Sequence, residues 1–194
     1  MAIRGISRDI QSQIYLEAKN QLQAIIKAKF AKIKNEMIAE FESHPVTIEL
    51  DGGPNASNIS GTLGRGNLFS FIGFDQSAKP TEVIRQALMN TEVFLTRAPR
   101  GHFNVSFTLP TKEDLFSKTP LPWATGRSWL KGIEHGLSGL GKYMYGKFES
   151  GRSGTGIQSK RSIGMGKFKN TKYISQILNR AETKMATLDK GLAI

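Results

Sequence analysis

The sequence predicts an α+β fold, with a long N-terminal helix, a small, mostly antiparallel sheet with a packed helix, a basic Gly/Ser-rich C-terminal arm and a final helix. Two patterns carry this prediction. Apolar residues recur at helical spacing near both ends, and they alternate with polar residues in short segments of the middle. We expect a single domain over residues 1–194, divided into the helix (1–44), an α+β core (45–125), and the arm with its helix (126–194).

The first element is one long amphipathic helix over residues 7–43. Ser7 is its expected N-cap, and the proline after His44 ends it, because a residue before proline disfavours the helical conformation. Its apolar residues mostly lie three or four positions apart: Ile10, Ile14, Ala18, Leu22, Ile25, Ile26, Ile33, Met37 and Phe41. A helix of roughly 55 Å exceeds what a small core covers, so we expect part of it to pack on a partner chain. The alternative is a helix broken near residues 27–34, where four lysines crowd together.

The next segment is expected to form most of the sheet. Apolar and polar residues alternate over residues 46–50, which predicts a half-buried strand, and residues 51–55 form a turn or loop. Two further strands are expected over residues 59–63 and 67–74. The Gly64-Arg65-Gly66 segment between them favours a hairpin, because glycine adopts positive φ without strain.

A helix should follow from Pro80 to about Arg97, since proline is favoured at the first helical position. Its expected buried face consists of Val83, Ile84, Ala87, Leu88 and Phe94. Residues 102–109 then alternate strictly and predict a strand. The apolar face of this strand consists of Phe103, Val105, Phe107 and Leu109.

The C-terminal third mixes helical spacing with many glycines. Residues 110–125 are expected to be a proline-stiffened loop with a helical turn at 112–116. A helix follows from Ser128 to about Tyr145, although each interior glycine costs a helix about 1 kcal/mol relative to alanine. We expect residues 150–166 to be a β-hairpin arm or a loop that becomes ordered on assembly. An amphipathic helix over residues 171–188 completes the chain.

Positive charge is concentrated in the same third. The net charge of the chain is +11, and residues 117–194 contribute fourteen Lys/Arg against four Asp/Glu. A basic segment of this kind is attracted to anionic surfaces, which include nucleic acid, lipid headgroups and acidic proteins. The candidate binding residues for a protein partner or for nucleic acid are Arg152, Lys160, Arg161, Lys167, Lys169 and Lys172.

The pattern of reactive side chains argues against an enzyme. There is no cysteine, so disulfides and thiolate metal sites are excluded. The three histidines (His44, His102 and His135) lack the spacing of metal ligands. Residues 136–143 approach a phosphate-binding loop, but Tyr143 replaces the Ser/Thr that such a loop needs, and no strand precedes it. We expect no catalysis, metal, cofactor or small-molecule substrate. A nuclease, the enzyme alternative, would need a carboxylate cluster drawn from Glu49, Asp51, Glu113 and Asp114.

The chain also lacks the marks of a membrane or secreted protein. No apolar run approaches the roughly 18 residues needed to span a bilayer, and the N-terminal residues lack the apolar region of a secretion signal. We therefore expect a soluble protein that is made in a reducing cytoplasm.

The arrangement resembles the small head–tail joining proteins of tailed bacteriophages, the neck or tail-completion class. The residues that carry the resemblance are the leading helix over 7–43, the Arg97-Ala-Pro-Arg-Gly101 turn before the strand at Phe103, and the Gly/Ser-rich basic segment 151–162. In that class a helix that ends in an Ala-Pro-x-x-Gly-like turn precedes a strand. Here Arg100-Gly101 stands in place of the usual Thr-Gly.

This resemblance implies a non-enzymatic virion protein of the neck or tail, made in the host cytoplasm. It implies a homo-oligomeric ring between neighbouring portal, neck or tail proteins. A ring would sum the basic charge of its subunits into a collar that binds acidic faces of adjoining rings or lines a channel for DNA. The competing expectation is a nucleic-acid-binding module that acts through Lys160, Arg161, Lys167 and Lys169.

Overall fold

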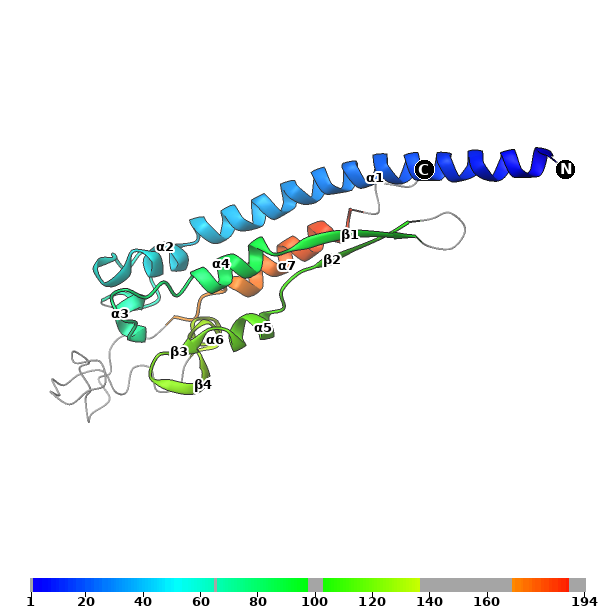
Figure 1. The fold of residues 1–194 in the computed structure, drawn as a ribbon. Coiled ribbons are helices and arrows are strands. Elements are labelled where there is room, and N and C mark those ends of the chain that lie inside the picture. The colour runs from blue at the N-terminus through cyan, green and yellow to red at the C-terminus, as the bar shows by residue number, and fades with distance from the viewer. Residues whose placement is uncertain (1, 65, 98–102, 137–168, 189–194) are drawn as a thin grey trace.

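The computed structural model of the protein is elongated, with one long helix along its side and the other elements gathered against that helix (Figure 1). The fold is α+β, as expected. The structure describes residues 2–64, 66–97, 103–136 and 169–188, with only the backbone described for residues 2–9, 11, 12 and 97.

Helix α1 (Ala2–Ser43) is continuous through its lysine-rich middle, so the alternative of a broken helix is wrong. It begins before Ser7, which is therefore not its N-cap. Its buried apolar side chains lie four or seven positions apart and are Leu22, Ile26, Phe30, Met37 and Phe41. Although α1 is long, it is too polar to span a membrane, and no other helix within the described ranges is long and apolar enough to do so.

The core packs against the C-terminal half of α1, where Arg85 joins three helices. Its guanidinium binds Glu42 at the end of α1 (2.6 Å), Asp51 at the end of α2 (Pro45–Asp51; 2.8 Å), and Glu82 on its own helix α4 (Glu82–Met89; 2.7 Å). The same guanidinium lies 5.8 Å from the ring centre of Phe41. These contacts hold the end of α1 against α2 and α4.

Residues 46–50 are helical, so the strand expected there is wrong. His44 is the N-cap of α2, accepting a hydrogen bond from the Val46 backbone amide (3.2 Å), and the proline at the first position favours a helix. Val46 and Leu50, four positions apart, are buried, whereas Ile48 is 48% exposed. A short 3-10 turn (Gly53–Asn55) follows, within the turn or loop that was expected.

The hairpin expected over residues 59–74 is also absent, since the described residues 59–64 form no strand and residues 68–72 form helix α3 (Leu68–Ile72). Asn67 is the N-cap of α3 and accepts a hydrogen bond from the Ser70 amide (2.9 Å). Gly73 ends the helix at φ 84°, a conformation that glycine adopts without strain. Leu68, Phe69 and Ile72 are thereby buried on the inner side of α3.

The helix expected from Pro80 to Arg97 ends at Met89, and the rest of that segment forms strand β1 (Glu92–Arg97). Strand β1 pairs antiparallel with β2 (Phe103–Thr108), which confirms the strand expected at residues 102–109. Phe94 was expected on a buried helical face, but it is 45% exposed on β1 opposite Ser106. The hairpin runs beside the N-terminal half of α1 (Figure 1), and the Tyr15 and Phe103 rings stack at 5.1 Å.

Short elements fill the space below the C-terminal end of α1 (Figure 1). Helix α5 (Lys112–Ser117) confirms the helical turn expected there, and β3 (Pro120–Leu121) pairs with β4 (Ala124–Ser128) in a second two-stranded sheet that was not expected. The sheet structure is thus two separate antiparallel hairpins within the described residues. Helix α6 (Trp129–His135) ends at Gly136, before the expected Tyr145.

Helix α7 (Ile174–Met185) confirms the C-terminal helix, with somewhat shorter bounds. It packs along α1, and two exposed ion pairs mark their contact: Arg180 with Glu40 (2.5 Å) and Lys184 with Glu36 (2.6 Å). Because rising numbers on α7 meet falling numbers on α1, the two helices are antiparallel. The buried side chains of α7 are Ile174, Ile177, Leu178, Ala181 and Met185.

The helical assignment of α2 gives a stability test. Leu50→Ala should lower the free energy of unfolding by about 2–5 kcal/mol, because it empties a fully buried site. Ile48→Ala should change it by no more than about 0.5 kcal/mol, because Ile48 faces solvent. Urea denaturation measures both. A strand would place Ile48 and Leu50 on one face, so equal losses for the two variants would contradict the helix.

Candidate functional site

Four of the six basic residues proposed for binding lie outside the described residues: Arg152, Lys160, Arg161 and Lys167. The expected arm over residues 150–166 lies there as well. Lys169 and Lys172 are described, and both are exposed. The structure therefore places the C-terminal end of the basic segment, where the chain returns to the core.

The chain leaves the core and returns to it at one place. Gly136 ends α6 at φ 84°, and a Cβ built on it would lie 3.2 Å from Oδ1 of Asn170. The returning segment, residues 169–171, is fixed to the core by backbone hydrogen bonds. The Lys169 amide donates to the Thr62 carbonyl (3.0 Å), and the Thr171 amide donates to the Ile133 carbonyl (3.1 Å). Residues 136 and 170, the arm roots that flank the segment containing the expected arm, thus lie side by side.

Glu134 anchors the returning chain at the start of α7. Its Oε1 accepts hydrogen bonds from the backbone amides of Tyr173 (3.2 Å) and Ser175 (2.7 Å), two donors that the first turn of a helix leaves without intrahelical partners. A carboxylate at a helix N-terminus is also favoured by the helix dipole. Glu134 is only 8% exposed, and its Oε2 makes no hydrogen bond to any described group. No role for Glu134 was predicted from the sequence.

Tyr173 locks this junction to the end of α1. It is fully buried, its hydroxyl lies 2.6 Å from the Thr47 hydroxyl, and its ring packs on Phe41 (6.0 Å) and His44 (4.6 Å). Burial raises the pKa of Tyr173, so its hydroxyl stays protonated. The sequence did not predict this contact, because the expected helix over residues 171–188 included Tyr173, and its partner Thr47 lies 126 positions away.

A polar groove of about 600 Å³ runs along α7 from the end of α6. Its charged side chains include Lys172, Arg180 and Lys184, but Arg180 and Lys184 are paired with acids of α1. The hydrogen bond from Lys184 also holds the pKa of Glu36 below its ordinary value. Lys172 is therefore the one cation of this groove that makes no salt bridge with a described acid. The charged side chains of this groove mainly stabilise the contact between α1 and α7, so the groove presents little unpaired positive charge to a ligand.

The remaining chemistry candidates do not converge. Glu49 accepts the backbone amides of Ser60 (2.9 Å) and Leu68 (2.7 Å), while Asp51 binds Arg85 and accepts a hydrogen bond from Thr81. Glu113 and Asp114 begin α5, where Asp114 completes a capping box. The part of the chain that the structure describes contains no group of three or more His, Cys, Asp or Glu residues that could hold a metal ion. The carboxylate cluster of the nuclease alternative is therefore not formed.

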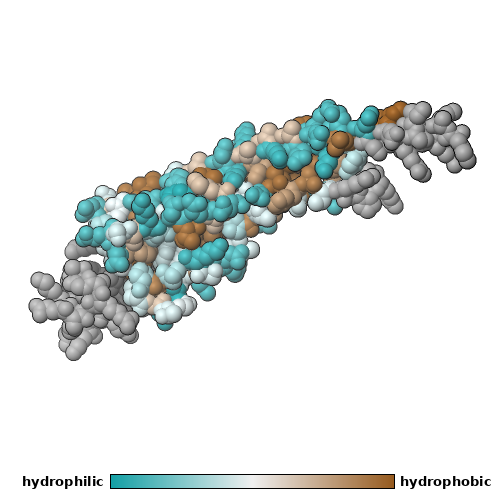
Figure 2. All heavy atoms as spheres, viewed as in Figure 1, coloured by the Kyte–Doolittle hydropathy of each residue, from teal (hydrophilic) through white to brown (hydrophobic). Residues whose placement is uncertain are grey.

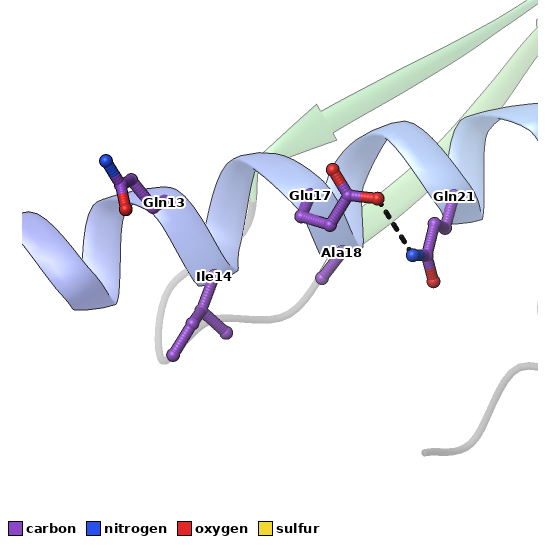
Figure 3. A pocket seen from close by; sticks show the side chains of 5 residues that line it. All are labelled: Gln13, Ile14, Glu17, Ala18 and Gln21. Atoms are coloured by element: carbon purple, nitrogen blue, oxygen red, sulfur yellow. Dashed lines mark hydrogen bonds between the residues drawn. The ribbon is translucent and has the colours of Figure 1, made fainter.

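Several exposed apolar side chains lie together at the other end of the molecule, on the N-terminal half of α1. No described side chain before Leu22 is buried, and Ile10, Ile14 and Leu16 are 49%, 64% and 57% exposed. Figure 2 shows apolar side chains on the face where α1 runs beside the first hairpin. A shallow hollow of about 440 Å³ lies here, lined by Gln13, Ile14, Glu17, Ala18 and Gln21 (Figure 3). This apolar stripe was predicted from the sequence, apart from Leu16, which lies off the stripe.

His44 should make stability depend on pH. Burial is the main cause that holds the pKa of His44 below its ordinary value of 6.5, so the folded state favours the neutral ring. The contribution of His44 to the stability of the fold is fully present above pH 6.5, where the histidine of the unfolded chain is also neutral. This contribution is lost as the pH falls from 6.5 through the lower pKa of the folded state. Protonation of His44 Nδ1 would also remove the lone pair that accepts the hydrogen bond from the Val46 amide and caps α2.

We expect the free energy of unfolding to fall as the pH drops below 6.5, and His44→Asn to weaken this dependence. Asparagine is a good N-cap that does not titrate, so the variant keeps the cap of α2 but no longer gains a proton as the pH falls. Urea denaturation of both proteins across this range makes the comparison. Identical pH profiles would show that His44 does not contribute.

No family model matches the chain, and the searches of curated proteins and of solved structures likewise returned no match.

Proposed function

We propose that the protein is a structural subunit that assembles into an oligomeric ring at the head–tail junction of a tailed bacteriophage, as a neck or tail-completion protein. The observation that carries the assembly part is the N-terminal half of α1. Its first turns project past the ends of strands β1 and β2 (Figure 1), and this half presents Ile10, Ile14 and Leu16 to solvent.

The energetics favour a partner for this half of the helix. Most of the stability of a helix in a protein comes from the packing of its apolar face rather than from its intrinsic propensity. Within the described residues, the first half of α1 lacks such a face, apart from the stacking of Tyr15 on Phe103. Covering a large apolar side chain contributes about 1.5–3 kcal/mol. Several isoleucine and leucine side chains along one helix therefore support assembly with other chains.

The phage assignment comes from the sequence resemblance. The element that precedes residues 98–101 is a strand rather than the helix that the resemblance implied. The assignment therefore rests on the long leading helix and on the basic C-terminal third. The subunit would then have neighbouring portal, neck or tail proteins as partners and would reside in the virion.

A second candidate function, nucleic-acid binding, is favoured by the net charge of +10 on residues 117–194 and by the exposure of Lys169 and Lys172. Both functions are compatible in one molecule, since a basic collar on a ring would lie near any DNA in the channel. They differ in what they require. Assembly depends on α1, whereas nucleic-acid binding depends on the basic segment.

The assembly proposal predicts a defined oligomer. Native mass spectrometry across a concentration series should show one closed species larger than a dimer, and negative-stain images should show rings. Cryo-electron microscopy of the phage that encodes the chain should place the ring between portal and tail. A protein that stays monomeric at high concentration and is missing from purified particles would sink the proposal.

The nucleic-acid function predicts steep salt dependence that comes from four residues. Changing Lys160, Arg161, Lys167 and Lys169 to Gln should weaken DNA and RNA binding. On duplex DNA it should also reduce the slope of log K against log salt by about 0.9 for each phosphate that the protein no longer neutralises. A variant with four exposed lysines of the body changed to Gln has the same net charge and serves as the control: Lys79, Lys112, Lys118 and Lys131. Equal effects of the two variants would mean that only net charge matters.

A further inference from the structure

The structure divides the uncovered half of α1 into two opposite flanks. Tyr15 points toward the hairpin and stacks on Phe103. Because successive residues of an α-helix are turned by about 100°, Ile14 and Leu16 point to opposite sides of the direction that Tyr15 takes. Their exposed fractions are similar, 64% and 57%. Each side of α1 therefore carries its own large apolar side chain next to the hairpin-facing surface.

The residues around each apolar side chain follow the same helical spacing. The Ile14 flank consists of Ile14, Glu17, Ala18, Gln21 and Ile25, all exposed. The Leu16 flank consists of Leu16, Lys19, Asn20, Gln23 and Lys27, which are exposed or half-buried. Both sets follow the spacing i, i+3, i+4, i+7 and i+11, which forms one continuous strip on a helix. The second strip is the first one moved along by two residues.

The two flanks are complementary in shape and charge. Ala18 leaves the hollow beside Ile14 on the first flank (Figure 3), whereas Leu16 projects from the second. The Ile14 flank carries one acid, Glu17, and no base. The Leu16 flank carries Lys19 and Lys27 and no acid, and neither lysine makes a salt bridge with a described residue.

From these flanks we infer that neighbouring copies of the chain pack side by side, with the Ile14 flank of one copy against the Leu16 flank of the next. The inference rests on the proposed assembly and specifies its surface. Two different patches that meet head to tail form a heterologous contact, which closes into a ring when the rotation between copies allows it. A contact of one flank with itself would stop at a dimer. Opposite flanks of one helix keep the α1 helices of adjacent copies side by side and parallel around the ring.

Two charge-introducing variants test this contact. Ile14→Lys places a cation opposite Lys19 and Lys27 of the neighbouring copy. Leu16→Glu places an acid opposite Glu17 of the neighbouring copy on the other side. Each variant alone should lose the closed oligomer in native mass spectrometry and run as a monomer. Ile48→Glu, on an isoleucine of α2 that is 48% exposed, is the matched control and should keep the wild-type oligomer. Circular dichroism checks that every variant keeps its helix content.

Mixing the two variants separates the two kinds of contact. An equal mixture should recover closed oligomers, because half of the junctions are native pairs and the other half bring opposite introduced charges together. If like flanks met, Leu16→Glu would dimerise through its intact Ile14 flank without any mixing, and the mixture would recover nothing. Either of those results overturns the inference.

Cross-linking gives a second measurement that does not depend on weakening the contact. The chain has no cysteine, so Ile14→Cys with Leu16→Cys introduces the only thiols. A short bismaleimide should join this double variant into a ladder that extends beyond dimers, while neither single variant should cross-link. Wild-type rings together with no ladder would refute the flank contact and leave the ring proposal standing. A wild-type protein that is monomeric at every concentration would refute both.

Discussion

The structure depends on a mismatch between the length of α1 and the size of the core that covers it. A helix of 42 residues is about 60 Å long, while its buried side chains run only from Leu22 to Phe41. Every other described element packs along this helix or on elements that do. The covered half organises the domain, and the uncovered half cannot be explained by the domain alone. The uncovered half therefore points beyond a single copy of the chain.

The junction around Tyr173 gives the covered half its connectivity. Tyr173 brings the start of α7 against the end of α1 through Phe41 and His44, and Glu134 caps the same turn of α7 from α6. Three elements distant in sequence are thus fastened at one point, directly beside the roots of the basic arm. When the ends of an insertion lie side by side, the entropic cost of closing it grows only slowly with its number of residues. The close approach of residues 136 and 170 therefore tolerates a long segment between them at little entropic cost.

The sequence predicted the elements whose signals are long and periodic. The periodicity of α1, of α7 and of the strand at Phe103 was sufficient to identify each one. The failures came from short segments, where five alternating residues match a strand as well as a turn of helix. After Pro45, the alternation of apolar and polar residues wrongly indicated a strand with one exposed face. Thr47 and Glu49 are polar, but both are fully buried, because they form hydrogen bonds with Tyr173 and with the Ser60 amide, each more than ten positions away. Asn67 is the N-cap of α3 and Gly73 ends it. The sequence prediction gave more weight to the apolar run between these two residues and therefore assigned a strand. For the candidate sites, the apolar stripe of α1 was recognised, whereas the second flank needed the stacking of Tyr15 on Phe103 to define a direction.

The apolar flanks at Ile14 and Leu16 and the junction at Tyr173 lie far apart along α1, and this distance bears on how a strongly basic chain could self-associate. Copies that each carry a net +10 on residues 117–194 repel one another. The proposed seam at Ile14 and Leu16 lies roughly 40 Å along the helix from the end that meets Tyr173 and the arm roots. Charge interactions in physiological salt decay over about 8 Å, so the basic segments do not act directly on the seam. In parallel copies, however, these segments would start close together at the opposite end of the assembly and repel one another. The contacts of the proposed seam, apolar side chains with Glu17 facing Lys19 and Lys27, would have to offset this repulsion, which an acidic partner or DNA would reduce.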